Sequence, residues 1–329
     1  MTILNRRSFL ALTGSSIVPF ALGGASLSTA ITIDETLYID ESFRHFGPKP
    51  SSRVARLATG MKFTEGPCWF DEGRYLLFSD VKDDKIWRYD AQTRQAAVFR
   101  APSSHSNGLA RDLQGRLVVC EHAGRRVTRV EPDGSTTVLA DRYEGKRFNS
   151  PNDLAIHRDG SIWFTDPDYG LKSGGGSAPA ELPMQVYRLD PDAGTLWAVA
   201  RDPVKPNGIC FAPDYSNLYV ADSSRQFKLL VYDVIDGGKL SNPRSFGERL
   251  VGVPDGIACD RKGNVWASSG WRGAESNGVQ IFTPDGKLVG FIKLPEVCSN
   301  ICFGGETMDR LFMTARTSLY SIGVASRGF

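Results

Sequence analysis

The stretch PNGICFAPDYSNLYVAD, from Pro206 to Asp222, contains the unit from which the rest of the chain is built. A polar residue before a glycine opens it (Asn207-Gly208), and a short apolar run, a turn and a second apolar run follow. Two apolar runs joined by a Pro-Asp turn indicate two β-strands. The unit therefore predicts a strand, a tight turn and a second strand.

The same order of features recurs five more times along the chain. Close copies begin at Asn107, Asn152 and Asp255, and looser copies begin at Glu65 and Asn300. Successive copies start 42 to 55 residues apart, and hairpin-like segments between them supply further strands. Repeats of this period are typical of propeller blades. We therefore predict an all-β fold, a six-bladed β-propeller with four antiparallel strands per blade.

The last repeat is one strand short, because the sequence after Asn300 supplies only three strands before it ends. A lone apolar run, VARLA from Val54 to Ala58, precedes the first repeat. A propeller must close its ring or leave an exposed strand edge. We predict that this N-terminal strand closes the last blade, so that the propeller spans residues 54–329.

The N-terminus has the features of a targeting segment. Residues 5–10, NRRSFL, form a twin-arginine motif, and a mildly apolar run follows as far as Ala30. We interpret residues 1–30 as a twin-arginine signal peptide and expect export to the periplasm. The run is too short and too weakly hydrophobic for a stable membrane anchor in the mature protein. Residues 31–53 show no repeat and are interpreted as an N-terminal extension.

Composition excludes several classes of partner and bond. The formal net charge of +2 comes without a basic stripe interleaved with aromatic residues, which excludes a nucleic-acid surface. Four of the six cysteines fall inside predicted inner strands. Cys298 and Cys302 are four residues apart on one extended segment, so roughly 13 Å separates them, which is too far for a disulfide. We therefore expect six free thiols. We also expect the protein to be a monomer or a small homo-oligomer.

Each repeat starts an inner strand with a polar residue, so six polar side chains should converge at one end of the channel, which we call the top. These residues are Glu65, Asn107, Asn152, Asn207, Asp255 and Asn300. Their oxygens suit a hard cation of calcium type better than zinc or copper. The alternative is that Asn-Gly and Asp-Gly pairs only mark turns. That alternative leaves unexplained Glu65 and the presence of two carboxylates in one enclosed channel.

The connections at the top are longer and more varied than the turns at the bottom, which makes the top the candidate functional face. It carries Glu121 and His122, the connection 143–151 and the Gly-rich segment 166–183. That segment is either a flexible loop or a lid, and His122 is either a site residue or a packing histidine. The chain contains no GxSxG, HExxH or GxxxxGKS motif.

These residues resemble the gluconolactonase, or senescence-marker-protein (regucalcin), family of six-bladed propellers, from about Val54 to the C-terminus. The matching motifs are TEGP (64–67), NGLARDLQGRLVVCEH (107–122), RFNSPNDL (147–154), FTDPDYG (164–170), KPNG (205–208) and VPDG (253–256). The resemblance implies one divalent cation, held by Glu65, Asn207 and Asp255. Asn152 is implied as a further contact to the metal, its water or the substrate. Calcium is expected ahead of zinc, magnesium or manganese.

The resemblance also implies substrate contacts at the channel mouth. Arg147 is the nearest match to an arginine that holds substrate, and Glu181 to a glutamate on the third blade's top loop. Glu121 and His122 match the bacterial lactonase-like members.

Together these features predict an exported, metal-dependent hydrolase of sugar lactones. The cation would polarise the lactone carbonyl, and water would attack with Asp255 as general base and Glu121 or His122 as alternative bases. Two other functions fit the same fold. One is a phosphotriesterase similar to diisopropyl-fluorophosphatase, and the other is a non-catalytic ligand-binding propeller that needs no metal.

Overall fold

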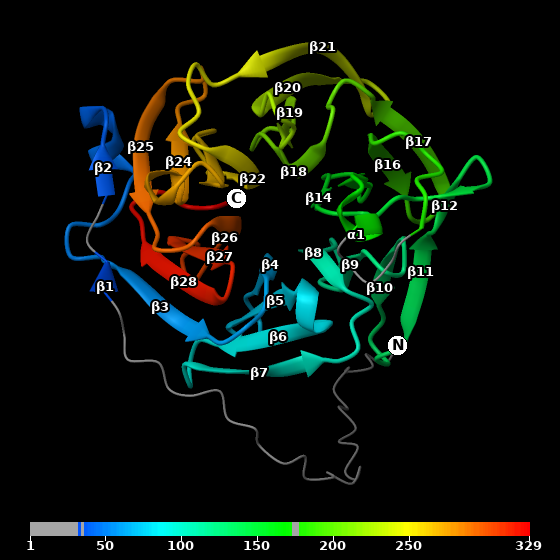
Figure 1. The fold of residues 1–329 in the computed structure, drawn as a ribbon, viewed down its shortest axis with the longest axis horizontal. Helices are drawn as coiled ribbons and strands as arrows, with labels where there is room; N and C mark the ends of the chain where they lie inside the picture. The colour runs from blue at the N-terminus through cyan, green and yellow to red at the C-terminus, as the bar shows by residue number, and fades with distance from the viewer. Residues whose placement is uncertain (1–31, 34–35, 173–177) are drawn as a thin grey trace, which may run out of the picture.

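The computed structural model describes residues 32–33, 36–172 and 178–329, and these form six sheets of four or five strands arranged around a central axis (Figure 1), together with one two-stranded sheet. The predicted six-bladed β-propeller is confirmed. The predicted signal peptide, residues 1–30, lies outside the described residues. In the described part of the chain, no helix is long and apolar enough to cross a membrane.

Blades one to three are four-stranded antiparallel sheets with their strands in chain order. Blade one contains β4 (Thr64–Phe70), β5 (Tyr75–Asp80), β6 (Lys85–Asp90) and β7 (Gln95–Arg100). Blade two contains β8 (Ser106–Arg111), β9 (Leu117–Glu121), β10 (Arg126–Val130) and β11 (Thr136–Ala140). The hairpin of β12 (Arg142–Tyr143) and β13 (Lys146–Arg147) leads to blade three. Blade three contains β14 (Leu154–Ile156), β15 (Ile162–Thr165), β16 (Val186–Asp190) and β17 (Thr195–Ala200).

Blade four has four strands, and blades five and six have five each. Blade four contains β18 (Pro206–Phe211), β19 (Asn217–Asp222), β20 (Lys228–Ile235) and β21 (Lys239–Phe246). Blade five contains β22 (Val253–Cys259), β23 (Val265–Gly270), β24 (Gly278–Phe282), β25 (Leu288–Lys293) and β2 (Thr36–Tyr38). Blade six contains β26 (Cys298–Gly304), β27 (Arg310–Ala315), β28 (Ser318–Gly323), β3 (Val54–Thr59) and β1 (Thr32–Ile33).

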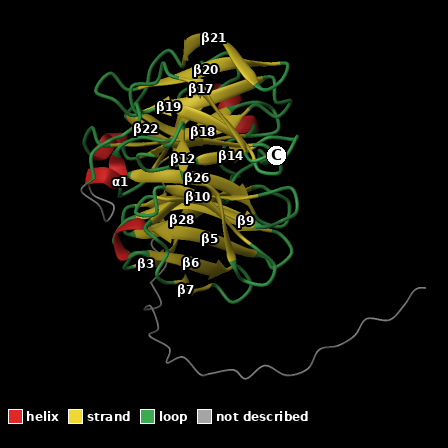
Figure 2. Cartoon of the chain, turned by 90° about the vertical axis from the view of Figure 1, so that its right-hand side faces the viewer, coloured by secondary structure: helices red, strands yellow, loops and turns green. Residues whose placement is uncertain are grey.

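Helical segments are few and short. They are α1 (Tyr169–Lys172) and the 3-10 helices η1 (Glu41–His45), η2 (Val81–Asp83) and η3 (Ala274–Ser276). Figure 2 shows α1 on one face of the propeller and the C-terminus on the opposite face. The α1 face is the top as defined above, because α1 follows the second strand of its blade.

The predicted closure of the last blade by an N-terminal strand is confirmed. β3 pairs antiparallel with β28, with Ala58 opposite Leu319 and Thr59 opposite Ser318. The Thr59 and Ser318 hydroxyl oxygens lie 2.9 Å apart. Blade six thus joins strands from both ends of the chain, which ties the ring shut.

The segment between residues 36 and 53, expected as an extension before the propeller, packs against two blades. β2 pairs with β25, and η1 places Phe43 in the core with no exposed surface. The Phe43 ring lies 6.1 Å from the Trp266 ring, centroid to centroid. A Cβ on Gly290 would lie 2.3 Å from the Phe43 ring, so this glycine forms the socket. The packing has no repeat pattern, which is why the sequence did not reveal it.

Aromatic residues fill the space between neighbouring blades. The centroids of Trp163 in blade three and Phe211 in blade four are 5.4 Å apart, as are those of Trp266 in blade five and Phe303 in blade six. Large rings at these positions bury extensive apolar area between the sheets. The core therefore lies between blades, and the channel is left for polar residues.

Candidate active site at the top of the channel

Backbone irregularities direct the polar ring residues into the channel. The pairing register shifts near the start of five of the six inner strands. In β18 the shift falls between Pro206 and Ile209, around Asn207. In β4 it falls between Glu65 and Cys68. Such bulges re-aim a side chain next to a functional site.

The glycine after a ring residue lets the next blade approach closely. A Cβ on Gly208 would lie 2.2 Å from the Asp255 carbonyl oxygen, and one on Gly66 would lie 2.1 Å from that of Asn107. Real Cβ atoms do not come this close to backbone. The Asn-Gly pair at 207–208 therefore begins a bulged strand and is not a turn.

Amide side chains form a hydrogen-bonded chain across half of the ring. Asn107 Nδ2 donates to Asn152 Oδ1 at 2.9 Å, and Asn152 Nδ2 donates to Asn207 Oδ1 at 2.6 Å. Asn207 Nδ2 donates to the Ser223 hydroxyl at 3.0 Å. The structure thus brings together Asn152 and Asn207, two of the residues expected to bind metal.

The other half of the ring contains two carboxylates, Glu65 and Asp255, together with Asn300. Burial, together with the nearby charges of Asp255 and Asp153, raises the pKa of Glu65 well above its usual range. Burial and the charge of Asp153 raise the pKa of Asp255 to about 8. Among the described residues, no Lys or Arg contributes to either shift. The charge of Asp255 therefore acts on Glu65, and neither carboxylate has a compensating cationic side chain among the described residues.

This donor set fits a hard divalent cation. Glu65 and Asp255 supply carboxylate oxygens, and Asn152 and Asn207 supply amide oxygens. The Oδ1 atom of Asn107 is buried with no hydrogen-bond partner among the described residues. No group of three or more His, Cys, Asp or Glu side chains in the described parts of the chain is arranged to hold a metal. A cation in this ring therefore depends on the amides as well as on the carboxylates.

His122 lies at the ring, next to the amide chain. Its Nε2 is 3.1 Å from Asn152 Oδ1 and 3.2 Å from Asn107 Nδ2. Burial lowers the pKa of His122 to about 4, so its imidazole is uncharged at neutral pH. The residue is suited to orient Asn152.

Glu121 is not brought to the ring, although it is the sequence neighbour of His122. Its carboxylate is fully buried and accepts from Arg126 Nε at 2.6 Å and from the Thr128 hydroxyl at 2.9 Å. Arg126 and Thr128 lie on β10, the neighbouring strand of the same blade. Successive side chains of a strand point to opposite faces, so Glu121 holds the blade together while His122 reaches the channel.

Arg147 and Glu181 meet on the rim of the top face. The Arg147 guanidinium donates to the Gly124 carbonyl at 2.7 Å, and its backbone N–H donates to Glu181 Oε2 at 3.1 Å. Glu181 also forms an ion pair with Arg125 at 3.1 Å. These contacts tie the connection before blade three to the loop that follows α1, without reaching the ring.

Tyr169, which was not predicted as a site residue, is placed beside the ring by α1. Asn207 Nδ2 donates to its hydroxyl at 3.3 Å. Lys205 Nζ lies 4.2 Å from its ring centroid and 3.1 Å from Asp168 Oδ1, which fixes the start of α1. Burial raises the pKa of Tyr169, so the hydroxyl stays protonated. The motif FTDPDYG contains this tyrosine, but nothing in it marks the side chain as one that enters the channel.

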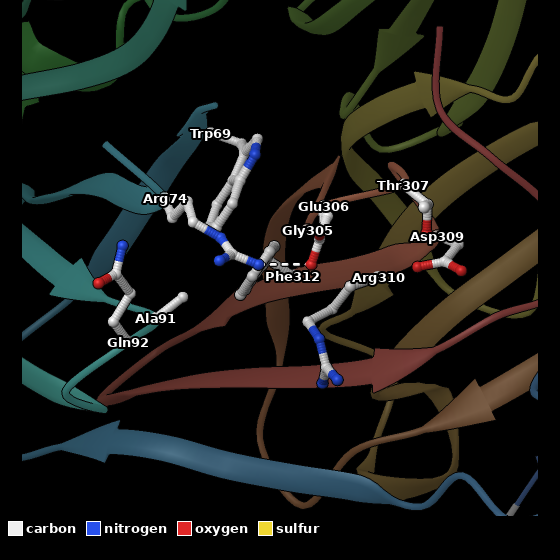
Figure 3. Close-up of a pocket in the computed structure, with 10 residues that line it drawn as sticks. All are labelled: Trp69, Arg74, Ala91, Gln92, Gly305, Glu306, Thr307, Asp309, Arg310 and Phe312. Carbon is white, nitrogen blue, oxygen red and sulfur yellow. Dashed lines mark hydrogen bonds and ion pairs between the residues drawn. The ribbon is translucent and has the colours of Figure 1, made fainter. Parts of the chain in front are cut away.

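Another hollow lies away from the ring. Figure 3 shows a pocket of about 450 Å³ at the bottom turns of blades one and six, where Arg74 and Glu306 form an ion pair. Its lining residues include Trp69, Arg310 and Phe312 and none of the six ring residues. The candidate site is therefore the ring at the top, where bulges, buried carboxylates and amides converge.

Residues 63–317 match the family described as the SMP-30/gluconolactonase/LRE-like region. The chain belongs to this family. The match begins two residues before Glu65 and ends at Thr317, so it contains all six ring residues.

Similar members of the family include lactone-hydrolysing enzymes. Gluconolactonase from Zymomonas mobilis is 32% identical over 306 residues, covering 84% of this chain and 83% of the relative. A pentonolactonase from Haloferax volcanii is 28% identical, covering 78% of this chain and 82% of the relative. The solved structure of a gluconolactonase from Xanthomonas campestris is 35% identical with a TM-score of 0.83, covering 90% of this chain and 98% of that one.

Proposed function

We propose that this protein is a lactonase of the SMP-30/gluconolactonase family that hydrolyses sugar lactones with one bound divalent cation. Calcium is the expected cation, ahead of the other divalent ions. The observation that carries the proposal is the ring of buried, uncompensated carboxylates and amide oxygens at the top of the channel. Its lactone-hydrolysing relatives support the reaction class. The twin-arginine motif of residues 5–10 supports export to the periplasm as part of the same proposal.

Four residues would hold the cation: Glu65, Asn152, Asn207 and Asp255. When bound, the cation supplies Lewis-acid polarisation of the lactone carbonyl and offsets the carboxylate repulsion. Asn107 and His122 contact Asn152 and fix the orientation of its amide.

The chain's own groups account for the proton transfers. Once a cation has offset the repulsion and Asp255 is ionised, water would add to the carbonyl carbon while the Asp255 carboxylate accepts its proton. The C–O bond of the lactone ring then breaks, and the departing oxygen takes back that proton from Asp255, which gives the hydroxy acid and restores the carboxylate. Tyr169, protonated and next to Asn207, is placed to donate a hydrogen bond to a substrate oxygen. Glu121 takes no part, since both of its oxygens are paired within blade two.

The first test replaces the proposed base. Asp255→Asn keeps the shape but removes a charge and the proton acceptor, so we expect kcat for lactone hydrolysis to fall by about 100-fold or more, with weaker cation binding. Hydrolysis is followed by acid release, and cation binding by calorimetry.

Asn107→Ala is the matched control, because Asn107 shares the ring position but supplies no proposed ligand; we expect it to lose far less activity than Asp255→Asn. A chelator should abolish hydrolysis, and calcium should restore it. Near-normal activity and metal affinity in Asp255→Asn would refute the proposal. Faster turnover of an organophosphate triester than of any sugar lactone would instead favour the phosphotriesterase alternative.

A further inference from the structure

A cavity of about 530 Å³ lies in the channel; it is lined by inner strands and extends from Asn300 of the ring to the C-terminal residue Phe329. Figure 1 places the C-terminus within the ring of blades, and Figure 2 places it on the face opposite α1. Four cysteines from four blades line this cavity: Cys68, Cys210, Cys259 and Cys302. The other two, Cys120 and Cys298, are buried and are not among its lining residues.

Two of these thiols are in direct contact across a blade boundary. Cys210 on β18 and Cys259 on β22 have their sulfur atoms 3.6 Å apart. A disulfide has an S–S distance of about 2.05 Å, so the two sulfurs need to approach by only about 1.5 Å. All six cysteines carry free thiols in the structure. By contrast, Cys298 donates to the Asn300 carbonyl, 3.8 Å away, and not to another sulfur.

The cavity gives the pair a route to solution. Cys210 is 8% exposed and Cys259 is 4% exposed, and both border the cavity. Arg111 and Arg261 also line it, together with Phe329 at its lower end. A small oxidant therefore has a path from the bottom face to both sulfurs without passing the ring at the top.

We propose that Cys210 and Cys259 are a redox-active dithiol that forms a disulfide between blades four and five when a low-molecular-weight disulfide enters the cavity. One cysteine sulfur attacks the incoming disulfide as a thiolate, forming a mixed disulfide and releasing one small thiol. The second cysteine sulfur, also as a thiolate, then attacks the first and displaces the other small thiol. The two cysteine protons end on the released thiols, so the protein loses two electrons and two hydrogens to the oxidant.

The bond would join the two strands that carry Asn207 and Asp255, three and four residues before the cysteines. It would close a loop between positions 49 apart in sequence and remove freedom from the unfolded chain. Burial raises the pKa of Cys259 well above its usual range, so oxidation should be slow at neutral pH and faster as the pH is raised.

The experiment treats the folded full-length protein with oxidised glutathione at pH 8.5, removes the excess, and alkylates the remaining thiols in denaturant without reductant. Mass spectrometry should count four alkylated thiols instead of the six of the untreated protein. A non-reducing peptide map should show Cys210 linked to Cys259. The melting temperature should rise, and a reductant should reverse the rise.

Two variants make the assignment specific. Cys210→Ser should retain all five of its thiols after oxidation, whereas the control Cys120→Ser should still lose two. If Cys210→Ser does not fold, Cys259→Ser tests the same bond from the other strand, and the wild-type peptide map decides alone. Six alkylated thiols after treatment, or a map that links Cys68 to Cys302 instead, would overturn the proposal.

Discussion

At the residue scale, the glycines that follow the ring residues hold the site together. Gly208 has the Asp255 carbonyl where its Cβ would be, and Gly256 has the Asn300 side chain there. The Asn-Gly and Asp-Gly pairs were therefore informative for a different reason from turn formation. They let the ring residue of the next blade pack directly against the backbone of the glycine.

Replacing Gly208 with Ala should be strongly destabilising. The added Cβ would lie 2.2 Å from a backbone oxygen, which cannot move like a flexible side chain. We expect a loss of about 3 kcal/mol in the free energy of unfolding, at the upper end for overpacking, measured by urea titration. Gly134→Ala is the control, since its Cβ meets nothing within 4 Å and only its φ of +84° is strained. A control loss equal to that of Gly208→Ala would contradict the close-approach argument.

The sequence predicted site residues that occupy repeated positions and missed those that do not. Asn152 and Asn207 begin equivalent strands, so alignment of the repeats alone places them together. Tyr169 comes from an irregular loop, where no period indicates the direction of a side chain. Glu121 shows that a residue next to a site residue in sequence need not reach the site, because side chains alternate along a strand and Glu121 points away from the side of His122. Likewise, the separation of Cys298 and Cys302 along one strand gave no information on Cys210 and Cys259, which meet across two strands.

At the element scale, the N-terminal segment 36–53 packs against the propeller and contributes a strand to it. β2 adds a fifth strand to blade five and covers its outer edge, and η1 fills a socket beside Trp266. The closing strand β3 was predictable, because a missing fourth strand must be supplied from elsewhere. β2 was not, because blade five is already complete without it.

Phe43→Ala should show how firmly this segment contributes. Phe43 is fully buried against Trp266 and Gly290, and we expect its truncation to cost about 3 kcal/mol, within the range for Phe-to-Ala changes in cores. Leu37→Ala, in β2 and 48% exposed, serves as control and should cost less than about 1 kcal/mol. Both are measured by chemical denaturation. Equal stability of Phe43→Ala and wild type would mean that the segment is only loosely attached.

At the scale of the whole molecule, a closed circle of hydrogen bonds joins each blade to the next near the top of the channel. The donors and acceptors are Ser79 to Asn107 O, Gly108 N to Asn152 O, Thr165 to Asn207 O, Ser223 to Pro254 O, Ser268 to Ser299 O, and Ser299 to Thr64 O. The circle fixes the positions of the ring residues and concentrates their carboxylates at one point. The free energy of unfolding should therefore depend on protonation of these carboxylates and on cation binding to them.

Without bound cation, the raised pKa of Asp255 should make the fold less stable as pH rises. Its pKa is about 8 in the folded chain against an ordinary value of 3.8, so the folded state holds the proton more tightly than the unfolded state. The contribution of Asp255 to the free energy of unfolding should therefore decrease as the pH rises from about 4 to about 8. Asp255→Asn should lack this component, which is measured as the difference between the two proteins' melting curves in chelator.

Calcium should reverse the loss in the wild type, because it binds only the folded ring. Its effect should be largest at the high-pH end of the range, where the carboxylates are charged. Melting temperatures of wild type and Asp255→Asn that run parallel from pH 4 to pH 8 would show that the ring carboxylates do not repel each other as inferred.

The pairing of β3 with β28 also imposes an order in time. The ribosome releases β3 among the first strands and β28 as the last, and the Thr59 and Ser318 hydroxyls that meet are 259 positions apart. β3 therefore lacks its partner strand until the intervening blades have been synthesised, and pairing of strands so distant in sequence is a contact that slows folding. A chain that stops before β28 has nothing to close with. The seam in blade six therefore makes closure of the ring depend on both strands, so the ring cannot close before β28 has been made.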